Sequence, residues 1–453
     1  MVVIFVVVSG VVLALYGALH WYAWRRLVRD TTAKGSLLRR AGSVAFVAGP
    51  LLSIAGMSAE GEAVPFLLQR ILAWPGYLWM ALFLYLLLAL LVGEVVRPVL
   101  RRWFVRRSAV TDPRQGAAPA AQSAEAQESD SGAEELVSAG EPLTAPAHLG
   151  DSDAARGTAG SVAVLDPPPT PAASSTPTDP SRRLFVSRVV GGTAAAVTVA
   201  TVGQGTYGLL RGPRVKRLTV PLARLPRSAH GFRIAVVSDI HVGPVLGRAF
   251  AQRVVDTVNA TQPDLIAVVG DLVDGSVENL TSAVEPLVGL RARHGAYFVT
   301  GNHEYISGAE PWIEKVRELG LRPLENARTE LPGFDLAGVN DVRGEEEGQG
   351  PDFGKALGDR DRSRTAVLLA HQPVVIEDAV RHGVDLQLSG HTHGGQLWPG
   401  NYLAELANPT VAGLERYGDT QLYVSRGAGA WGPPVRVGAP SDITVIELAS
   451  RQA

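Results

Sequence analysis

The first quarter of the chain alternates between long uncharged apolar runs and short clusters of basic residues. Three such runs cover residues 1–24, 41–59 and 71–93, and each is dominated by aliphatic, aromatic or small side chains. About 20 predominantly apolar residues in a helix are enough to cross the hydrocarbon core of a bilayer. We therefore predict three transmembrane helices within a membrane region that spans residues 1–107.

Basic residues predict how these helices are oriented. Arginine and lysine are concentrated between the first two runs and again after the third, whereas the loop between the second and third runs carries Glu60 and Glu62. Basic loops remain on the cytoplasmic side of a membrane. The N-terminus is therefore expected outside, and the chain is expected to re-enter the cytoplasm near Arg97.

Residues 108–180 have a different character. They contain no Phe, Trp or Tyr, are rich in Ala, Pro and acidic residues, and include three consecutive prolines at 167–169. Such a segment cannot bury enough apolar surface to offset the entropy lost on ordering. We predict a disordered acidic linker on the cytoplasmic side.

A fourth apolar segment follows within residues 181–210. The pair Arg182-Arg183 precedes an uncharged stretch, 189–210, that is rich in Gly, Ala, Thr and Val. This arrangement resembles a twin-arginine (Tat) export signal, and an ordinary fourth transmembrane helix is the alternative. More basic residues follow the segment than precede it, and this charge distribution opposes export. Two considerations favour export: after three spans the chain is in the cytoplasm, so a fourth span would bring it out, and a Tat signal is recognised by a receptor rather than through charge balance alone. We therefore expect the Tat machinery as a partner and the remaining chain on the extracellular face.

Residues 211–229 are basic and are interpreted as a connector to a domain at 230–449. In that domain, amphipathic helical patterns such as 247–260 and 311–319 separate short apolar runs. This alternation predicts an α/β domain with its functional site at the carboxyl ends of buried strands. The five apolar runs lie at 232–238, 264–270, 296–301, 365–370 and 384–389.

Histidine-rich polar clusters follow these five runs directly. The chain has no cysteine, so the clusters offer oxygen and nitrogen ligands without sulfur. Such a set suits Mn, Fe(II) or Zn better than Ca or Mg, and seven ligands with one shared carboxylate suffice for two adjacent divalent metal ions. The clusters are Asp239-Ile240-His241, Gly270-Asp271, Gly301-Asn302-His303-Glu304, His371, and Gly390-His391-Thr392-His393.

Composition and charge exclude several other classes of protein. The lack of cysteine excludes disulfide scaffolds, thiolate metal sites and cysteine nucleophiles. The formal net charge of −2 conceals blocks of +8, −9, +9 and −10 for residues 1–107, 108–180, 181–230 and 231–453. A final domain with a charge of −10 does not support nucleic-acid binding.

The ordered series Asp-x-His, Gly-Asp, Gly-Asn-His-Glu, His and Gly-His-x-His resembles the calcineurin-like metallophosphoesterase superfamily. The strings GHTHGGQ at 390–396, SRG at 425–427 and PPVR at 433–436 are similar to the membrane-associated bacterial branch typified by the YkuE and YaeI phosphodiesterases. The resemblance covers residues 230–449. It implies a four-layer β-sandwich flanked by helices, here preceded by the transmembrane helices and the disordered linker.

The same resemblance implies roles for individual side chains. His303 would not bind metal but would donate a hydrogen bond or proton near the leaving oxygen, with Glu304 as its partner. Independently of the resemblance, Arg426 and Arg436 are candidates to clamp a phosphate, with surface or structural roles as the alternative. The implied ligands are Asp239, His241 and His393 for the first metal ion, Asn302, His371 and His391 for the second, and Asp271 as the bridge.

Three aromatic residues follow the last metal motifs. Trp398, Tyr402 and Trp431 are candidates to line a substrate groove, and burial in the core is the alternative.

The leading functional hypothesis is a membrane-anchored hydrolase in which metal-activated hydroxide attacks phosphorus in line. The resemblance favours phosphodiesters, with pyrophosphates or monoesters as alternatives, and the anchor favours lipid- or envelope-linked substrates. A membrane sensor or scaffold with a catalytically weak domain is disfavoured by the complete ligand set. A transporter with an accessory domain is disfavoured because the four predicted spans lack charged residues.

Overall fold

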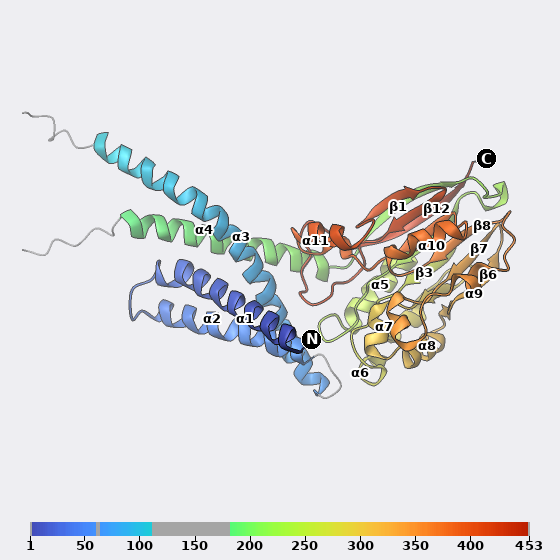
Figure 1. Ribbon diagram of the computed structural model, residues 1–453, viewed down its shortest axis with the longest axis horizontal. Helices are drawn as coiled ribbons and strands as arrows, with labels where there is room; N and C mark the ends of the chain where they lie inside the picture. The colour runs from blue at the N-terminus through green and yellow to red at the C-terminus, as the bar shows by residue number, and fades with distance from the viewer. Residues whose placement is uncertain (1, 60–63, 111–181, 452–453) are drawn as a thin grey trace, which may run out of the picture. The chain divides into compact units, whose positions relative to one another are not determined.

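A computed structural model describes residues 2–59, 64–110 and 182–451 of the chain (Figure 1). Residues 1–101 and 183–453 belong to one compact unit. Apart from its first three residues, the predicted disordered linker at 108–180 lies outside the described residues.

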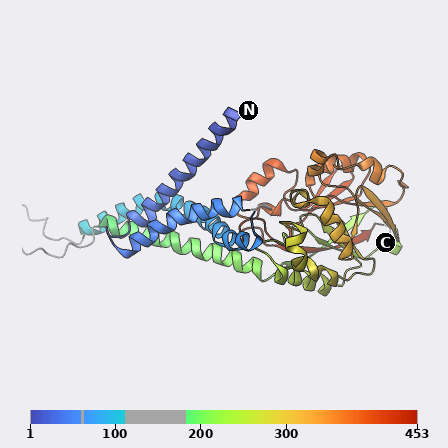
Figure 2. The ribbon, with the colours of Figure 1, turned by 90° about the horizontal axis from the view of Figure 1, so that it is seen from below.

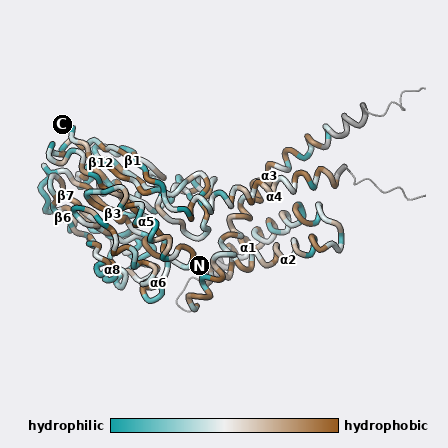
Figure 3. The backbone as a smooth tube through the Cα atoms, turned by 180° about the vertical axis from the view of Figure 1, so that it is seen from behind, coloured by the Kyte–Doolittle hydropathy of each residue, from teal (hydrophilic) through white to brown (hydrophobic). Residues whose placement is uncertain are grey.

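Long helices in the described part of the chain contain the four apolar segments. Each is long and apolar enough to cross a membrane, and Figure 3 shows hydrophobic residues along them. The third helix continues beyond residue 107, where the membrane region was expected to end, and a short π-helix, Arg25–Arg29, follows the first. The four are α1 (Val2–Trp24), α2 (Leu37–Ser58), α3 (Phe66–Val110) and α4 (Arg182–Leu210).

The interpretation of residues 211–229 as a connector is wrong. Strand β1 (Arg214–Leu222) begins almost directly after α4 (Figure 2) and pairs in parallel with the last strand, β12 (Asp442–Ser450). β1 is the edge strand of its sheet, so its basic residues remain in solvent and Pro221 is tolerated. The α/β domain therefore starts at β1.

The first of two six-stranded sheets has the order β1-β12-β2-β3-β4-β5. Its central strands β2, β3 and β4 are parallel neighbours, and β3 and β4 are fully buried, as expected for apolar strands covered on both faces. The remaining strands are β2 (Phe232–Val237), β3 (Leu265–Val269), β4 (Ala296–Val299) and β5 (Arg322–Pro323).

The second sheet has the order β10-β11-β9-β8-β7-β6. The five strands predicted from apolar runs are confirmed as β2, β3, β4, β8 and β9. The strands of this sheet are β6 (Ala327–Leu331), β7 (Phe334–Gly338), β8 (Thr365–Leu369), β9 (Leu386–Ser389), β10 (Gly413–Tyr417) and β11 (Thr420–Val424).

Helices cover the outer face of each sheet. On the first sheet, Phe250, Val254 and Val258 form one apolar face of α5, which packs with α6 and α8 against the strands. α9 and α10 cover the second sheet. The helices are α5 (Arg248–Ala260), α6 (Val277–Val284), α7 (Asn302–Ser307), α8 (Ala309–Glu318), α9 (Phe353–Leu357), α10 (Ile376–Arg381) and α11 (Gly400–Ala407).

The two sheets pack face to face through a separate core. Ile234 and Val236 from the first sheet and Leu336, Val367 and Leu388 from the second belong to this cluster. The order helix, sheet, sheet, helix confirms the predicted four-layer sandwich. Short 3₁₀ segments lie in the connections at Arg227–Ala229, Glu285–Gly289, Val342–Glu347, Pro373–Val375 and His393–Gly395.

Candidate metal centre

The first group of predicted ligands comes from the loops that follow β2 and β9. The Nε2 atoms of His241 and His393 lie 3.0 Å apart, and His393 Nε2 is 3.3 Å from Asp239 Oδ1. All three side chains are buried. One carboxylate and two imidazoles therefore direct ligand atoms at a common point.

The second group comes from the loops after β3, β4, β8 and β9. His371 Nε2 lies 3.1 Å from Asp271 Oδ2, and His391 Nδ1 lies 2.9 Å from Asn302 Oδ1. Asp271 Oδ2 is also 3.8 Å from His241 Nε2. The structure thus brings all seven predicted ligands together, with Asp271 between the two groups.

The backbone at these ligands is held in an uncommon conformation. Asp239, His241, Asp271, His391 and His393 have φ between 51° and 72°. A left-handed conformation costs a non-glycine residue about 1–3 kcal/mol, and such residues cluster at functional sites. The fold therefore maintains local strain at five of the seven ligand positions.

Two glycines of the motifs allow the loops to approach each other closely. A Cβ atom at Gly301 would lie 2.3 Å from Asp271 Oδ1, and one at Gly390 would lie 1.8 Å from Ser238 Oγ. Any side chain at either position would therefore displace the ligand loops.

Hydrogen bonds behind the imidazoles fix tautomers that suit a metal cation. Val269 O accepts a hydrogen bond from His371 Nδ1 at 2.9 Å, so the lone pair of Nε2 faces the centre. This Nε2 is buried and makes no hydrogen bond within the described part of the chain. Asp274 Oδ1 similarly accepts from His241 Nδ1 at 2.8 Å. Neutral imidazoles and carboxylates, held from behind, fit a divalent cation.

Comparison with known proteins agrees with this geometry. The family model for calcineurin-like phosphoesterases matches residues 232–395. An uncharacterized metallophosphoesterase from Aquifex aeolicus is 32% identical over 243 residues, which cover 52% of this chain and 92% of that protein. The chain belongs to the calcineurin-like metallophosphoesterase family. Membership of this family indicates a metal-dependent phosphoester hydrolase, and candidate ligands for such metals are present here.

Two further relatives extend the comparison. A transmembrane protein with metallophosphoesterase domain from Danio rerio is 40% identical over 267 residues, covering 55% of this chain and 61% of that protein. The uncharacterized metallophosphoesterase YkuE from Bacillus subtilis is 28% identical over 280 residues, covering 60% of this chain and 98% of that protein. The chain thus spans about three fifths of the zebrafish relative, and the apolar helices and that relative's name both indicate membrane association.

The partner of His303 in this metallophosphoesterase is Asp274, a residue that the sequence motifs did not single out. Asp274 Oδ1 lies 2.7 Å from His303 Nδ1 and also accepts from His241. Burial opposes protonation of His303, but the Asp274 carboxylate outweighs it and raises the pKa of His303 to about 9. Burial likewise opposes ionisation of Asp274, while His241 and His303 lower its pKa to about 2. The only signal in the sequence is an acidic residue three positions after Asp271.

Glu304 does not have the predicted role as partner of His303. Its carboxylate accepts hydrogen bonds from the backbone N–H groups of Gly301 (2.6 Å), Asp271 (3.0 Å) and Leu272 (2.8 Å). Burial, followed by the charge of Asp271, raises the pKa of Glu304 to about 7. Its bond from Gly301 N caps the start of α7, and the bonds from Asp271 and Leu272 join the loops after β3 and β4. Its side chain therefore supports the ligands from behind.

Arg436 is buried beneath the centre. Its guanidinium donates to the carbonyl oxygens of Gly429, His393 and Arg426, and its Nη2 lies 3.1 Å from His393 Nδ1. These contacts correspond to the structural alternative, because they use the guanidinium within the protein. Arg426 is half-buried, and phosphate binding by its side chain stays a prediction.

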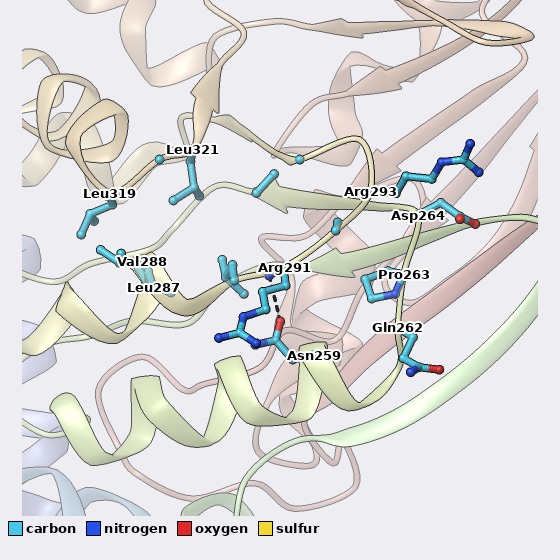
Figure 4. Close-up of a pocket in the computed structure, with 15 residues that line it drawn as sticks. Asn259, Gln262, Pro263, Asp264, Leu287, Val288, Arg291, Arg293, Leu319 and Leu321 are labelled. Carbon is cyan, nitrogen blue, oxygen red and sulfur yellow. Dashed lines mark hydrogen bonds between the residues drawn. The ribbon is translucent and has the colours of Figure 1, made fainter.

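A surface hollow of about 840 Å³ lies away from these residues (Figure 4). It is lined by Asp264 and Ala296, near the starts of β3 and β4, and by Asn259 and Arg291. The metal ligands follow the opposite, carboxyl ends of these strands. Since this hollow lacks the converging ligands, we assign the chemistry to the strand ends.

Proposed function

We propose that the protein is a membrane-anchored phosphohydrolase that uses two divalent metal ions, Mn, Fe or Zn, to cleave phosphodiester bonds. The observation that carries this proposal is the position of Asp271 between two groups of nitrogen and oxygen ligands. When bound, two such ions activate water and stabilise charge on the attacking and leaving oxygens. Pyrophosphate or monoester bonds are the alternative substrates.

His303 would act as the proton donor to the leaving oxygen. Its Nδ1 is held by Asp274, which leaves Nε2 for a substrate, and its ring lies 5.6 Å from the ring of Trp431. A charged imidazole near a leaving oxygen favours departure of that group. The raised pKa of His303 supports this role.

We further propose that the protein spans the membrane several times and displays the hydrolase domain on the extracellular face. The four long apolar helices and the distribution of basic residues support this topology. Under this proposal, Arg182-Arg183 and the apolar stretch after them act as the Tat-dependent export signal. The anchor favours substrates that are linked to lipid or to the cell envelope.

Activity of the full-length protein in detergent tests the hydrolase proposal. Bis(p-nitrophenyl) phosphate and p-nitrophenyl phosphate would be assayed with Mn²⁺, Zn²⁺ or Fe²⁺, and the diester is expected to be the better substrate. His371→Ala should lower turnover by at least about 100-fold, because it removes a metal ligand. His382→Ala is the matched control, since His382 lies on the same domain and its Nδ1 contacts Asp378 O.

Failure of the wild-type protein with every metal and both substrates would contradict the proposal and favour a sensor or scaffold. Equal loss of turnover in both variants would show that the assay reports folding rather than metal binding.

A further inference from the structure

We propose that α11 and the flanking residues Trp398 and Trp431 form a membrane-docking surface that presents bilayer-resident, amphiphilic phosphodiesters to the metal centre. This inference rests on the proposed hydrolase function and specifies where its substrate resides. We call Trp398, Tyr402, Leu403, Leu406 and Trp431 the apolar patch.

The apolar patch is unusually exposed for a folded α/β domain. No residue of α11 is buried, and Leu403 and Leu406 are 71% and 84% exposed. Tyr402, Leu403 and Leu406 share one face of the helix, whereas Asn401 and Glu405 lie on the other. Exposed apolar groups concentrated in one place indicate an interaction surface.

Hydrogen bonds and a ring contact connect the apolar patch to residues of the candidate metal centre. The Gln396 side chain donates to Trp431 O (2.8 Å) and accepts from Trp431 N (3.1 Å), so two hydrogen bonds join the loop before α11 to the loop that carries Trp431. Gln396 follows the ligand His393 in the same turn, and the Trp431 ring lies against His303. A molecule held on the patch would therefore have a short path to the site.

The same two loops contact the apolar helices α3 and α4. Tyr85 of α3 donates a hydrogen bond to Trp398 O at 2.9 Å. Ala81, Tyr85, Val202 and Val435 form one buried cluster, against which Leu397 also packs. Both helices qualify as membrane spans, and Tyr85 lies within the uncharged run at 71–93. The loops that carry the patch therefore pack directly against two candidate membrane spans.

Depth and charge favour a bilayer as the occupant. Arg436 N lies 3.4 Å from Gly205 O, five residues before α4 ends at Leu210, which corresponds to about 8 Å of helix. Measured along α4, the loop that carries Trp431 and Arg436 therefore lies near the end of a span, where Trp and Tyr are favoured. Arg211, Arg214 and Arg217 are exposed just beyond α4 and would attract anionic head groups.

Depth measurement tests the patch without relying on enzyme activity. The chain has no cysteine, so Leu406→Cys can carry a single nitrobenzoxadiazole label, and Val288→Cys is the matched control because Val288 is 61% exposed elsewhere on the domain. The full chain would be reconstituted in vesicles of phosphatidylethanolamine and phosphatidylglycerol with nitroxide-labelled lipids. Lipid nitroxides are expected to quench the label at 406 and not at 288. Equal, weak quenching at both positions would overturn the proposal. This result is also expected if a second copy of the chain, rather than the bilayer, covers position 406.

Activity on two diesters tests the substrate class. Leu403→Glu combined with Leu406→Glu should slow hydrolysis of hexadecyl p-nitrophenyl phosphate in vesicles by about tenfold, because two leucines that docking would bury in the bilayer are lost. The same double variant should cleave bis(p-nitrophenyl) phosphate in solution at the wild-type rate to within about twofold. The control variant Val288→Glu should cleave both substrates at the wild-type rate to within the same factor.

The possible failures are distinguishable. Equal rates of the wild-type and double variant on the vesicle-borne diester would overturn the substrate inference. If the wild-type protein cleaves neither diester, the proposed hydrolase function fails, while the depth measurement still decides whether the patch docks on a bilayer.

Discussion

The carboxylate of Asp274 contacts both a candidate metal ligand and the proposed proton donor. It accepts from the imidazole of the metal-ligand candidate His241 and from that of the proposed proton donor His303. The polar clusters could be recognised in the sequence because each follows a buried strand, and the family resemblance implied which seven of their residues are ligands. Neither predicted Asp274, because an acidic residue in a turn is common and only the loop geometry places it between two rings.

At the scale of single residues, we expect Asp274→Asn to shift the alkaline limb of kcat/KM to lower pH. The carboxylate raises the pKa of His303 to about 9, so the charged imidazole persists to about that pH in the wild-type protein and is lost earlier without the carboxylate. Activity at pH 8 should fall about 10- to 100-fold. A pH–rate profile on bis(p-nitrophenyl) phosphate measures this change.

Asp264→Asn is the control for that prediction. Asp264 lies just before β3, at the end of this strand opposite to Asp274, and its side chain accepts a hydrogen bond from Arg233 N. An Asp274→Asn profile that overlays the wild-type alkaline limb would show that His303 does not depend on Asp274.

At the scale of elements, the sequence predicted those strands whose residues are apolar on both faces. It did not predict β1, because three basic residues, Arg214, Lys216 and Arg217, conceal the strand's alternation at an exposed edge. Short strands such as β5, which has two residues, carry too little pattern to be recognised. The partner of Glu304 was also mispredicted, because its bonds to backbone amides depend on how two loops meet.

We expect Glu304→Gln to destabilise the domain by about 1–3 kcal/mol, because an amide cannot accept from the same three backbone N–H groups without presenting its own donors to them. A thermal melt of the full-length protein in detergent should show a midpoint lower by several degrees, at about 2–4 °C per kcal/mol. Glu310→Gln is the control, since Glu310 is exposed on α8. Equal midpoints for the two variants would contradict the bracing role of Glu304.

At the scale of the whole molecule, the distribution of basic residues predicts which side of the membrane the hydrolase domain lies on. Contacts within the protein do not determine this orientation. We expect Val288→Cys to react with a membrane-impermeant maleimide in intact cells and Lys34→Cys to react only after lysis. Both positions are exposed, and the chain offers no competing thiol. The opposite pattern would place the hydrolase domain in the cytoplasm. Replacing Arg182 and Arg183 together by lysine should abolish labelling of Val288→Cys if export depends on the Tat signal.

Metal titration of the purified full-length chain tests the central claim most directly. Metal-free protein would be loaded stepwise with Mn²⁺ while bound metal and hydrolysis of bis(p-nitrophenyl) phosphate are measured on the same samples. Because Asp271 lies between two ligand groups, we predict two bound ions per chain, with hydrolysis rising as the second ion binds. Full activity with one ion, or undiminished activity in the metal-free protein, would contradict a two-metal phosphohydrolase.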